Sequence, residues 1–119
     1  MTDKRKLGDF GEKKVKNYLR LKGYKVIGSN YTAKYGEIDI IAKKSDLIIF
    51  VEVKTRKAGS MVKGVYAVNL AKRQRIIKTA KKFMYENNIG LQPRFDVAEV
   101  EVTDGFIKRA KINYIENAY

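Results

Sequence analysis

Two carboxylates and a lysine lie in two short β-prone segments, and side chains of these types are suited to phosphodiester chemistry. Asp39 is in the first segment, and Glu52 and Lys54 are in the second. The segments flank Ser45-Asp46 closely enough to form a hairpin. A turn centred between Ser45 and Asp46 would place Asp39 opposite Glu52, whereas a loop of odd length would make them diagonal neighbours.

Two carboxylates at opposed strand positions destabilise the sheet unless their charge is compensated, because directly opposed Cβ atoms are about 4.5–5.5 Å apart and like charges repel. A hard divalent cation compensates this charge, since Mg²⁺ is typically held by one or two carboxylates, waters and phosphate oxygens. The pair therefore indicates a site for Mg²⁺ or Mn²⁺, with Lys54 near the scissile phosphate. The alternative is a ladder of ion pairs on a solvated face of the sheet.

The overall charge favours a polyanionic partner. The 119 residues include 26 Lys and Arg against 13 Asp and Glu, which gives a net charge of +13. Cationic side chains that neutralise phosphates release counterions, so nucleic acid is the leading partner class. An acidic membrane surface is a weaker alternative, and a lysine-rich solubilising surface would also explain the charge. The chain has no Cys and no His, which excludes disulfides, thiolate zinc sites and a histidine general base.

The hydrophobic pattern predicts a single α/β domain over residues 1–119. Gly23 is expected to end a first helix, and Asn69 to cap a second. The order αβββαββ indicates a mixed central sheet flanked by helices. The predicted helices span 5–22 and 70–87, and the predicted strands span 24–31, 37–43, 47–54, 94–102 and 106–115, with a loop over 56–69. A membrane span needs about 20 consecutive apolar residues, and every apolar run of this chain is much shorter. The N-terminal segment also has no apolar signal-peptide core. We therefore expect a soluble cytoplasmic protein without membrane association.

The signature residues resemble those of a known nuclease group. Asp39, followed after a hairpin by Glu52-Val53-Lys54, resembles the D…(D/E)-x-K signature of the PD-(D/E)XK superfamily, which includes restriction endonucleases and archaeal Holliday junction resolvases. Ile38 stands where that superfamily often has proline. More narrowly, the chain looks like the YraN-type family of uncharacterised bacterial proteins. The motifs that carry this resemblance are Gly8-x-x-Gly11-Glu12, Gly23-Tyr24, Asn30-Tyr31, Gly36-Glu37-Ile38-Asp39, Phe50-Val51-Glu52-Val53-Lys54-x-Arg56 and Lys72.

The resemblance implies a restriction endonuclease-like αβββαβ core and assigns roles to individual residues. It implies Asp39 and Glu52 as ligands of Mg²⁺ or Mn²⁺, Lys54 as the catalytic lysine and Glu12 as a further acidic residue from the first helix. Such folds often contribute a polar or basic residue at the start of the second helix. Arg73 there is either a snorkelling side chain or a phosphate ligand. The predicted nucleic-acid contacts are Arg56, Lys72, Arg73, Gln74 and Arg75.

The leading hypothesis is a metal-dependent nuclease that hydrolyses DNA, which we favour over RNA as substrate, in branched or single-stranded form. A homodimer is compatible with this hypothesis. The second hypothesis is a non-catalytic nucleic-acid-binding module that keeps the fold and uses the basic surface alone. A third is a small accessory protein bound to an acidic protein partner. Cleavage that depends on a metal ion and on Asp39 would separate the first hypothesis from the other two.

Overall fold

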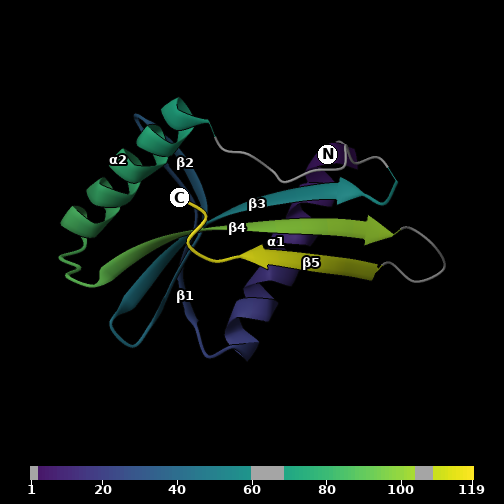
Figure 1. Ribbon diagram of the computed structural model, residues 1–119, viewed down its shortest axis with the longest axis horizontal. Coiled ribbons are helices and arrows are strands. Elements are labelled where there is room, and N and C mark those ends of the chain that lie inside the picture. The colour runs from purple at the N-terminus through teal and green to yellow at the C-terminus, as the bar shows by residue number, and fades with distance from the viewer. Residues whose placement is uncertain (1–2, 60–68, 104–108) are drawn as a thin grey trace.

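The computed structural model describes residues 3–59, 69–103 and 109–119. These residues form two helices and a mixed five-stranded sheet with the strand order β1-β2-β3-β4-β5 (Figure 1). Strands β3 and β4 are parallel, and the other neighbouring strands are antiparallel. The predicted fold class and element order are therefore confirmed. The elements are α1 (Asp3–Leu21), β1 (Lys25–Ala33), β2 (Gly36–Lys44), β3 (Leu47–Lys57), α2 (Leu70–Glu86), β4 (Gln92–Thr103) and β5 (Arg109–Ile115).

Local signals set several of the element boundaries. Gly23 follows α1 with a φ of 92°, a left-handed conformation that glycine adopts without steric cost. The side chain of Asn69 accepts a hydrogen bond from a backbone N–H in the first turn of α2. The turn between β2 and β3 is centred between Ser45 and Asp46, as predicted. Strand β3 continues to Lys57 instead of ending at residue 54, because it stays paired with β4 along its whole length. Most of the predicted 56–69 loop and the start of the last predicted strand lie outside the described residues.

The two helices cover opposite faces of the sheet and produce two hydrophobic clusters. Val15 and Leu19 of α1 pack in one cluster with side chains of β2, β3 and β4. The other cluster contains Phe83 of α2 and Phe50 of β3, whose rings meet edge to face at 6.4 Å. Figure 1 shows α1 behind strands β3 to β5 and α2 beside β2. Neither described helix combines the length and apolar character that a membrane crossing requires.

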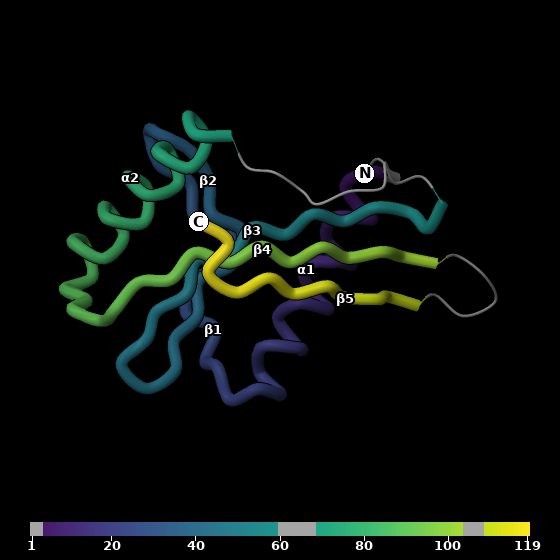
Figure 2. Tube along the Cα trace, in the orientation of Figure 1, coloured from purple at the N-terminus to yellow at the C-terminus, as the bar shows by residue number. Residues whose placement is uncertain are grey.

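Strands β2 and β3 separate partway along their length. Their ladder runs from Lys44↔Leu47 to Ile40↔Val51 and ends there. Beyond this point β2 remains paired with β1, while β3 remains paired with β4. Ile38 consequently packs in the α2-side cluster. Figure 2 shows the result: the β1–β2 hairpin runs at a steep angle to the strands β3, β4 and β5. Beyond this point β2 and β3 no longer bond to each other, so side chains can form hydrogen bonds with the backbone groups at the end of the β2–β3 ladder.

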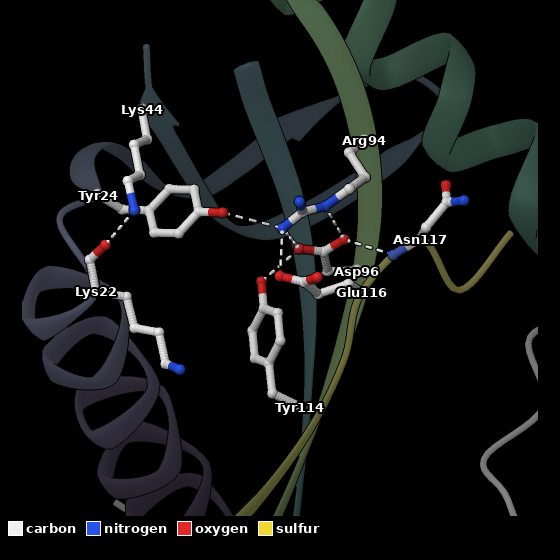
Figure 3. Close-up of polar contacts among 8 residues, drawn as sticks. All are labelled: Lys22, Tyr24, Lys44, Arg94, Asp96, Tyr114, Glu116 and Asn117. Carbon is white, nitrogen blue, oxygen red and sulfur yellow. Dashed lines mark hydrogen bonds and ion pairs between the residues drawn. The ribbon is translucent and has the colours of Figure 1, made fainter. Parts of the chain in front are cut away.

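A buried ionic network that the sequence did not predict fastens β4 to its surroundings. Asp96 is fully buried and accepts hydrogen bonds from Arg94 at 2.9 and 2.8 Å and from the Tyr114 hydroxyl at 2.6 Å. Arg94 also donates to the Tyr24 hydroxyl at 3.1 Å, and the backbone N–H of Asn117 donates to Asp96. Figure 3 shows these side chains pointing toward one another from β4, β5 and the segment after α1. Because the buried carboxylate has an ionic partner and several donors, we assign the network a structural role.

Candidate active site

Asp39 lies where β2 and β3 separate. Its Oδ2 atom accepts a hydrogen bond of 2.7 Å from the backbone N–H of Val53 on β3. Since the last ladder pair is Ile40↔Val51, the carboxylate stands in for the backbone carbonyl that a longer ladder would have supplied. Asp39 and Glu52 are therefore not ladder partners, although the turn is centred as predicted. The β3 backbone instead fixes the position of the Asp39 carboxylate.

The surroundings of Asp39 disfavour its charged form. Burial is the largest cause and raises the pKa of Asp39 from 3.8 to about 6. The hydrogen bond from Val53 works in the opposite direction, and the negative charges of Glu52, Glu12 and Glu37 raise the pKa further. Carboxylates from α1, β2 and β3 thus lie close enough to repel one another in a protein with a net charge of +13.

Glu52 forms an ion pair with a lysine from the opposite helix. The Nζ atom of Lys72, in the first turn of α2, contacts the Oε1 atom of Glu52. The Glu52 side chain is 15% exposed and the Lys72 side chain is 37% exposed. The structure therefore places Lys72, predicted as a nucleic-acid contact, at the predicted metal ligand itself. The sequence pattern did not predict this contact, because the two positions are 20 residues apart in the chain.

Glu12 is held in place by strand β1. Its Oε1 atom accepts hydrogen bonds from the Ser29 hydroxyl at 2.8 Å and the Asn30 side-chain amide at 3.0 Å. Lys16, one turn further along α1, lies 3.3 Å from the same oxygen. Asn30 has a left-handed φ of 51°. The Asn30-Tyr31 motif marked this segment in the sequence, and the structure gives Asn30 a role in orienting Glu12.

Helix α1 approaches β3 very closely at Gly11. A Cβ atom on this buried glycine would lie only 1.9 Å from the Oγ1 atom of Thr55. Such contacts do not occur between real atoms, so any side chain here must push the helix away from the strand. Gly11 precedes Glu12, and the close approach therefore determines how far Glu12 reaches toward Asp39. This provides a physical reason for glycine in the Gly8-x-x-Gly11-Glu12 motif.

Lys54 lines a pocket of about 320 Å³ together with Asp39 and Glu12. Lys4 and Arg5, from the first described turns of α1, line the same pocket. The sequence interpretation missed these two cations. The spacing of Lys4, Gly8 and Glu12 at intervals of four residues could have placed them on one side of the helix. Three of the four predicted catalytic residues, Asp39, Lys54 and Glu12, thus line one pocket. The fourth, Glu52, directly precedes Val53, which also lines this pocket.

The predicted nucleic-acid contacts lie on β3 and in the first turns of α2. Arg56 lies on β3, in register with Glu101 of β4. The guanidinium of Arg73 lies 5.5 Å from the centre of the Tyr119 ring, in a cation–π contact. Gln74 and Arg75 are exposed on α2. Their roles remain predictions, and Arg73 has a packing role in addition.

The donor chemistry of the predicted metal ligands suits an ion of the Mg²⁺ type, which prefers oxygen atoms. Asp39 and Glu52 supply carboxylate oxygens from adjacent strands, and the Oδ2 atom of Asp39 is already used by Val53. Within the residues that the structure describes, no three His, Cys, Asp or Glu side chains form a metal-binding group. Two carboxylates are enough for Mg²⁺, whose remaining positions are usually filled by water and phosphate oxygens. An ion at Glu52 would take over the charge compensation that Lys72 provides.

The αβββαββ order and the mixed five-stranded sheet define an α/β protein whose architecture is consistent with a nuclease-like core. The model of the uncharacterised protein family UPF0102 matches residues 11–100, and the chain belongs to this family. A UPF0102 protein of Clostridioides difficile is 46% identical over the full length of both chains. Another from Alkaliphilus oremlandii is 42% identical, covering 97% of this chain and 98% of that protein. The resemblance to the YraN-type family is thereby confirmed. The family description assigns no activity.

Proposed function

We propose that this protein is a metal-dependent nuclease that hydrolyses phosphodiester bonds in DNA. The observation that supports the proposal most is the environment of Asp39. The backbone N–H of Val53 holds its carboxylate at the end of the β2–β3 ladder. Burial and the neighbouring carboxylates raise the pKa of Asp39. Keeping such a carboxylate desolvated disfavours the folded state unless a cation compensates it. A protein with strong positive charge elsewhere would attract the polyanionic substrate to this acidic site.

In the proposed reaction each of the four site residues would have a separate role. Asp39 and Glu52 would hold Mg²⁺ or Mn²⁺, which when bound supplies an activated water and polarises the phosphate. Lys54 would stabilise the negative charge that develops on the phosphoryl oxygens. Glu12, oriented by Ser29 and Asn30, would hold a water or ligand in the same pocket.

The pH dependence of folding provides a test of Asp39 that does not require activity. The folded protein keeps the Asp39 proton up to a pH of about 6, whereas the unfolded chain loses it near 3.8. The unfolded state therefore binds fewer protons in this window, and in EDTA the Asp39 contribution lowers the free energy of unfolding as the pH rises. Asn cannot ionise and still offers an oxygen to Val53. We expect Asp39→Asn to be more stable than the wild type at neutral pH by on the order of 1 kcal/mol.

Addition of Mg²⁺ at neutral pH should reverse this order. The cation compensates the carboxylates of the wild type, so its melting temperature should rise with Mg²⁺ concentration. The melting temperature of Asp39→Asn should change little. Thermal denaturation followed by circular dichroism measures both effects. An identical Mg²⁺-induced rise in the two proteins would show that the ion binds elsewhere.

The activity itself is tested with labelled single-stranded, duplex, flap and four-way junction DNA in Mg²⁺ or Mn²⁺. We expect the wild type to cleave at least one of these substrates, and Asp39→Asn to cleave none. Binding should weaken steeply as salt increases, because phosphate contacts release counterions. If the wild type binds DNA in this way but cleaves no substrate, the nucleic-acid-binding module becomes the better description. If it does not bind DNA even at low salt, both nucleic-acid functions are wrong.

A further inference from the structure

Lys72 lies at the start of a firmly anchored helix. Asn69 caps α2, and its side-chain oxygen accepts a hydrogen bond of 2.9 Å from the backbone N–H of Lys72. The next residue, Arg73, places its guanidinium 5.5 Å from the centre of the Tyr119 ring, which stacks on the Phe95 ring of β4 at 5.4 Å. Local contacts therefore fix the backbone of Lys72. Its side chain, which is 37% exposed, is the part that can change partners.

A cation at this position needs an anionic partner. The positive end of the helix dipole disfavours cations in the first turn of a helix, and the first turn of α2 contains Lys72 and Arg73 but no acidic residue. The partner comes from β3, because the Nζ atom of Lys72 contacts the Oε1 atom of Glu52. The Glu52 side chain is 15% exposed. A lysine in contact with one of its oxygens therefore restricts the access of any other cation to that oxygen.

We propose that Lys72 competes with the metal ion for the Glu52 carboxylate, and that a phosphate group of the bound nucleic acid draws Lys72 away. The exchange keeps every charge compensated. Without ligands, Lys72 compensates Glu52. With both ligands, the metal ion compensates Glu52 and the phosphate compensates Lys72. The site thus binds metal weakly until a phosphate is present, and binds phosphate more tightly once the metal is present, because such coupling is reciprocal.

The inference rests on the proposed function, because Lys72 can compete with a metal ion only if Glu52 is a metal ligand. A lysine that merely ties α2 to β3 leads to a different expectation. Its removal would destabilise the protein and leave the metal affinity unchanged or lower. The removal of a competitor raises the metal affinity instead, so the direction of the change separates the two roles.

The experiment measures the binding of Mn²⁺ alone by isothermal titration calorimetry, and assigns to the site the binding that is lost in Asp39→Asn. The test variant is Lys72→Met, which removes the charge and keeps an apolar side chain of similar length. One control is Lys72→Arg, which retains the charge. The other is Lys81→Met, an exposed lysine of the same helix. Lys81 is about 13 Å further along the axis at 1.5 Å per residue, beyond the screening length of about 10 Å in 0.1 M salt.

We expect Lys72→Met to bind Mn²⁺ about five- to tenfold more tightly than the wild type. This change equals about 1–1.4 kcal/mol, which is near the upper end of what partly exposed ion pairs contribute. Lys72→Arg and Lys81→Met should bind Mn²⁺ much as the wild type does. Circular dichroism checks the fold of each variant. If Lys72→Met does not fold, Lys72→Gln tests the same point, because it still donates a hydrogen bond but carries no charge.

The second part repeats the titration with saturating thymidine 3′,5′-bisphosphate, which carries phosphate groups but no phosphodiester bond that a nuclease could cleave. Lys72 has then left Glu52 in the wild type, so the wild type and Lys72→Met should bind Mn²⁺ with the same affinity. Association of Mn²⁺ with the free probe is identical in both titrations and is subtracted.

Equal Mn²⁺ affinities of the wild type and Lys72→Met without the probe would overturn the proposal, as would a difference that persists unchanged at saturating probe. The proposed function can fail separately. If neither Asp39→Asn nor Glu52→Gln weakens Mn²⁺ binding, the metal site is wrong and the competition is rejected with it. If both weaken Mn²⁺ binding while Lys72→Met binds like the wild type, the metal site stands and the competition alone is rejected.

Discussion

Replacement of Lys54 by alanine is expected to slow metal-dependent cleavage by about 10²–10³-fold, the usual cost of losing one electrostatic stabiliser of a transition state. Lys54 lines the same pocket as Asp39 and Glu12, and it follows Glu52 by two residues on β3. DNA binding should be largely retained, because Lys54 is one of 26 basic residues. Single-turnover cleavage and fluorescence anisotropy on the same DNA substrate measure the two effects separately.

Lys57→Ala is the matched control for this experiment. Lys57 is the last residue of β3, is exposed and does not line the Lys54 pocket. Its replacement should lower the affinity for DNA slightly and leave the cleavage step unchanged. Equal cleavage rates for the Lys54 and Lys57 variants would remove Lys54 from the proposed mechanism. A loss of folding in Lys54→Ala would appear in its circular dichroism spectrum and in its DNA affinity.

Gly11→Ala should destabilise the protein by about 1–3 kcal/mol, the usual cost of overpacking a well-packed core. The new Cβ atom would lie 1.9 Å from Thr55 Oγ1 and 2.9 Å from Thr55 Cβ. Relief requires α1 to move away from β3, and Glu12 would move with it. We therefore also expect slower cleavage in any variant that still folds. Urea denaturation gives the change in the free energy of unfolding.

Gly8→Ala provides the control in the same helix. No atom lies within 4 Å of the position that its Cβ would occupy, so alanine should stabilise the helix by about 0.5–1 kcal/mol. Thr55→Ala should recover part of the stability lost in Gly11→Ala, because it removes the Oγ1 and Cγ2 contacts but leaves the Cβ contact. If both glycine variants stabilise the protein equally, the close approach of α1 to β3 is not a constraint. An absence of coupling between the Gly11 and Thr55 changes would lead to the same conclusion.

The amino-acid sequence determined the elements, their order and the main signature residues of the candidate site. Gly23 after α1, Asn69 before α2 and the turn at Ser45-Asp46 act through neighbouring residues, so their effects can be predicted from short stretches of chain. Asp39 and Glu52 were found because they interrupt apolar strands. Such an interruption is visible without knowledge of which strands become neighbours.

Only the tertiary structure decided how these residues meet. The β2–β3 ladder ends at Ile40↔Val51 because each strand continues with its other neighbour, and pairing between distant strands is not encoded in a local pattern. The same holds for the Lys72–Glu52 ion pair and the Arg73–Tyr119 contact. The pocket between α1 and β3 depends on how closely Gly11 allows the helix to approach the strand. These contacts join residues far apart in the chain, and their geometry is set by packing across the whole sheet.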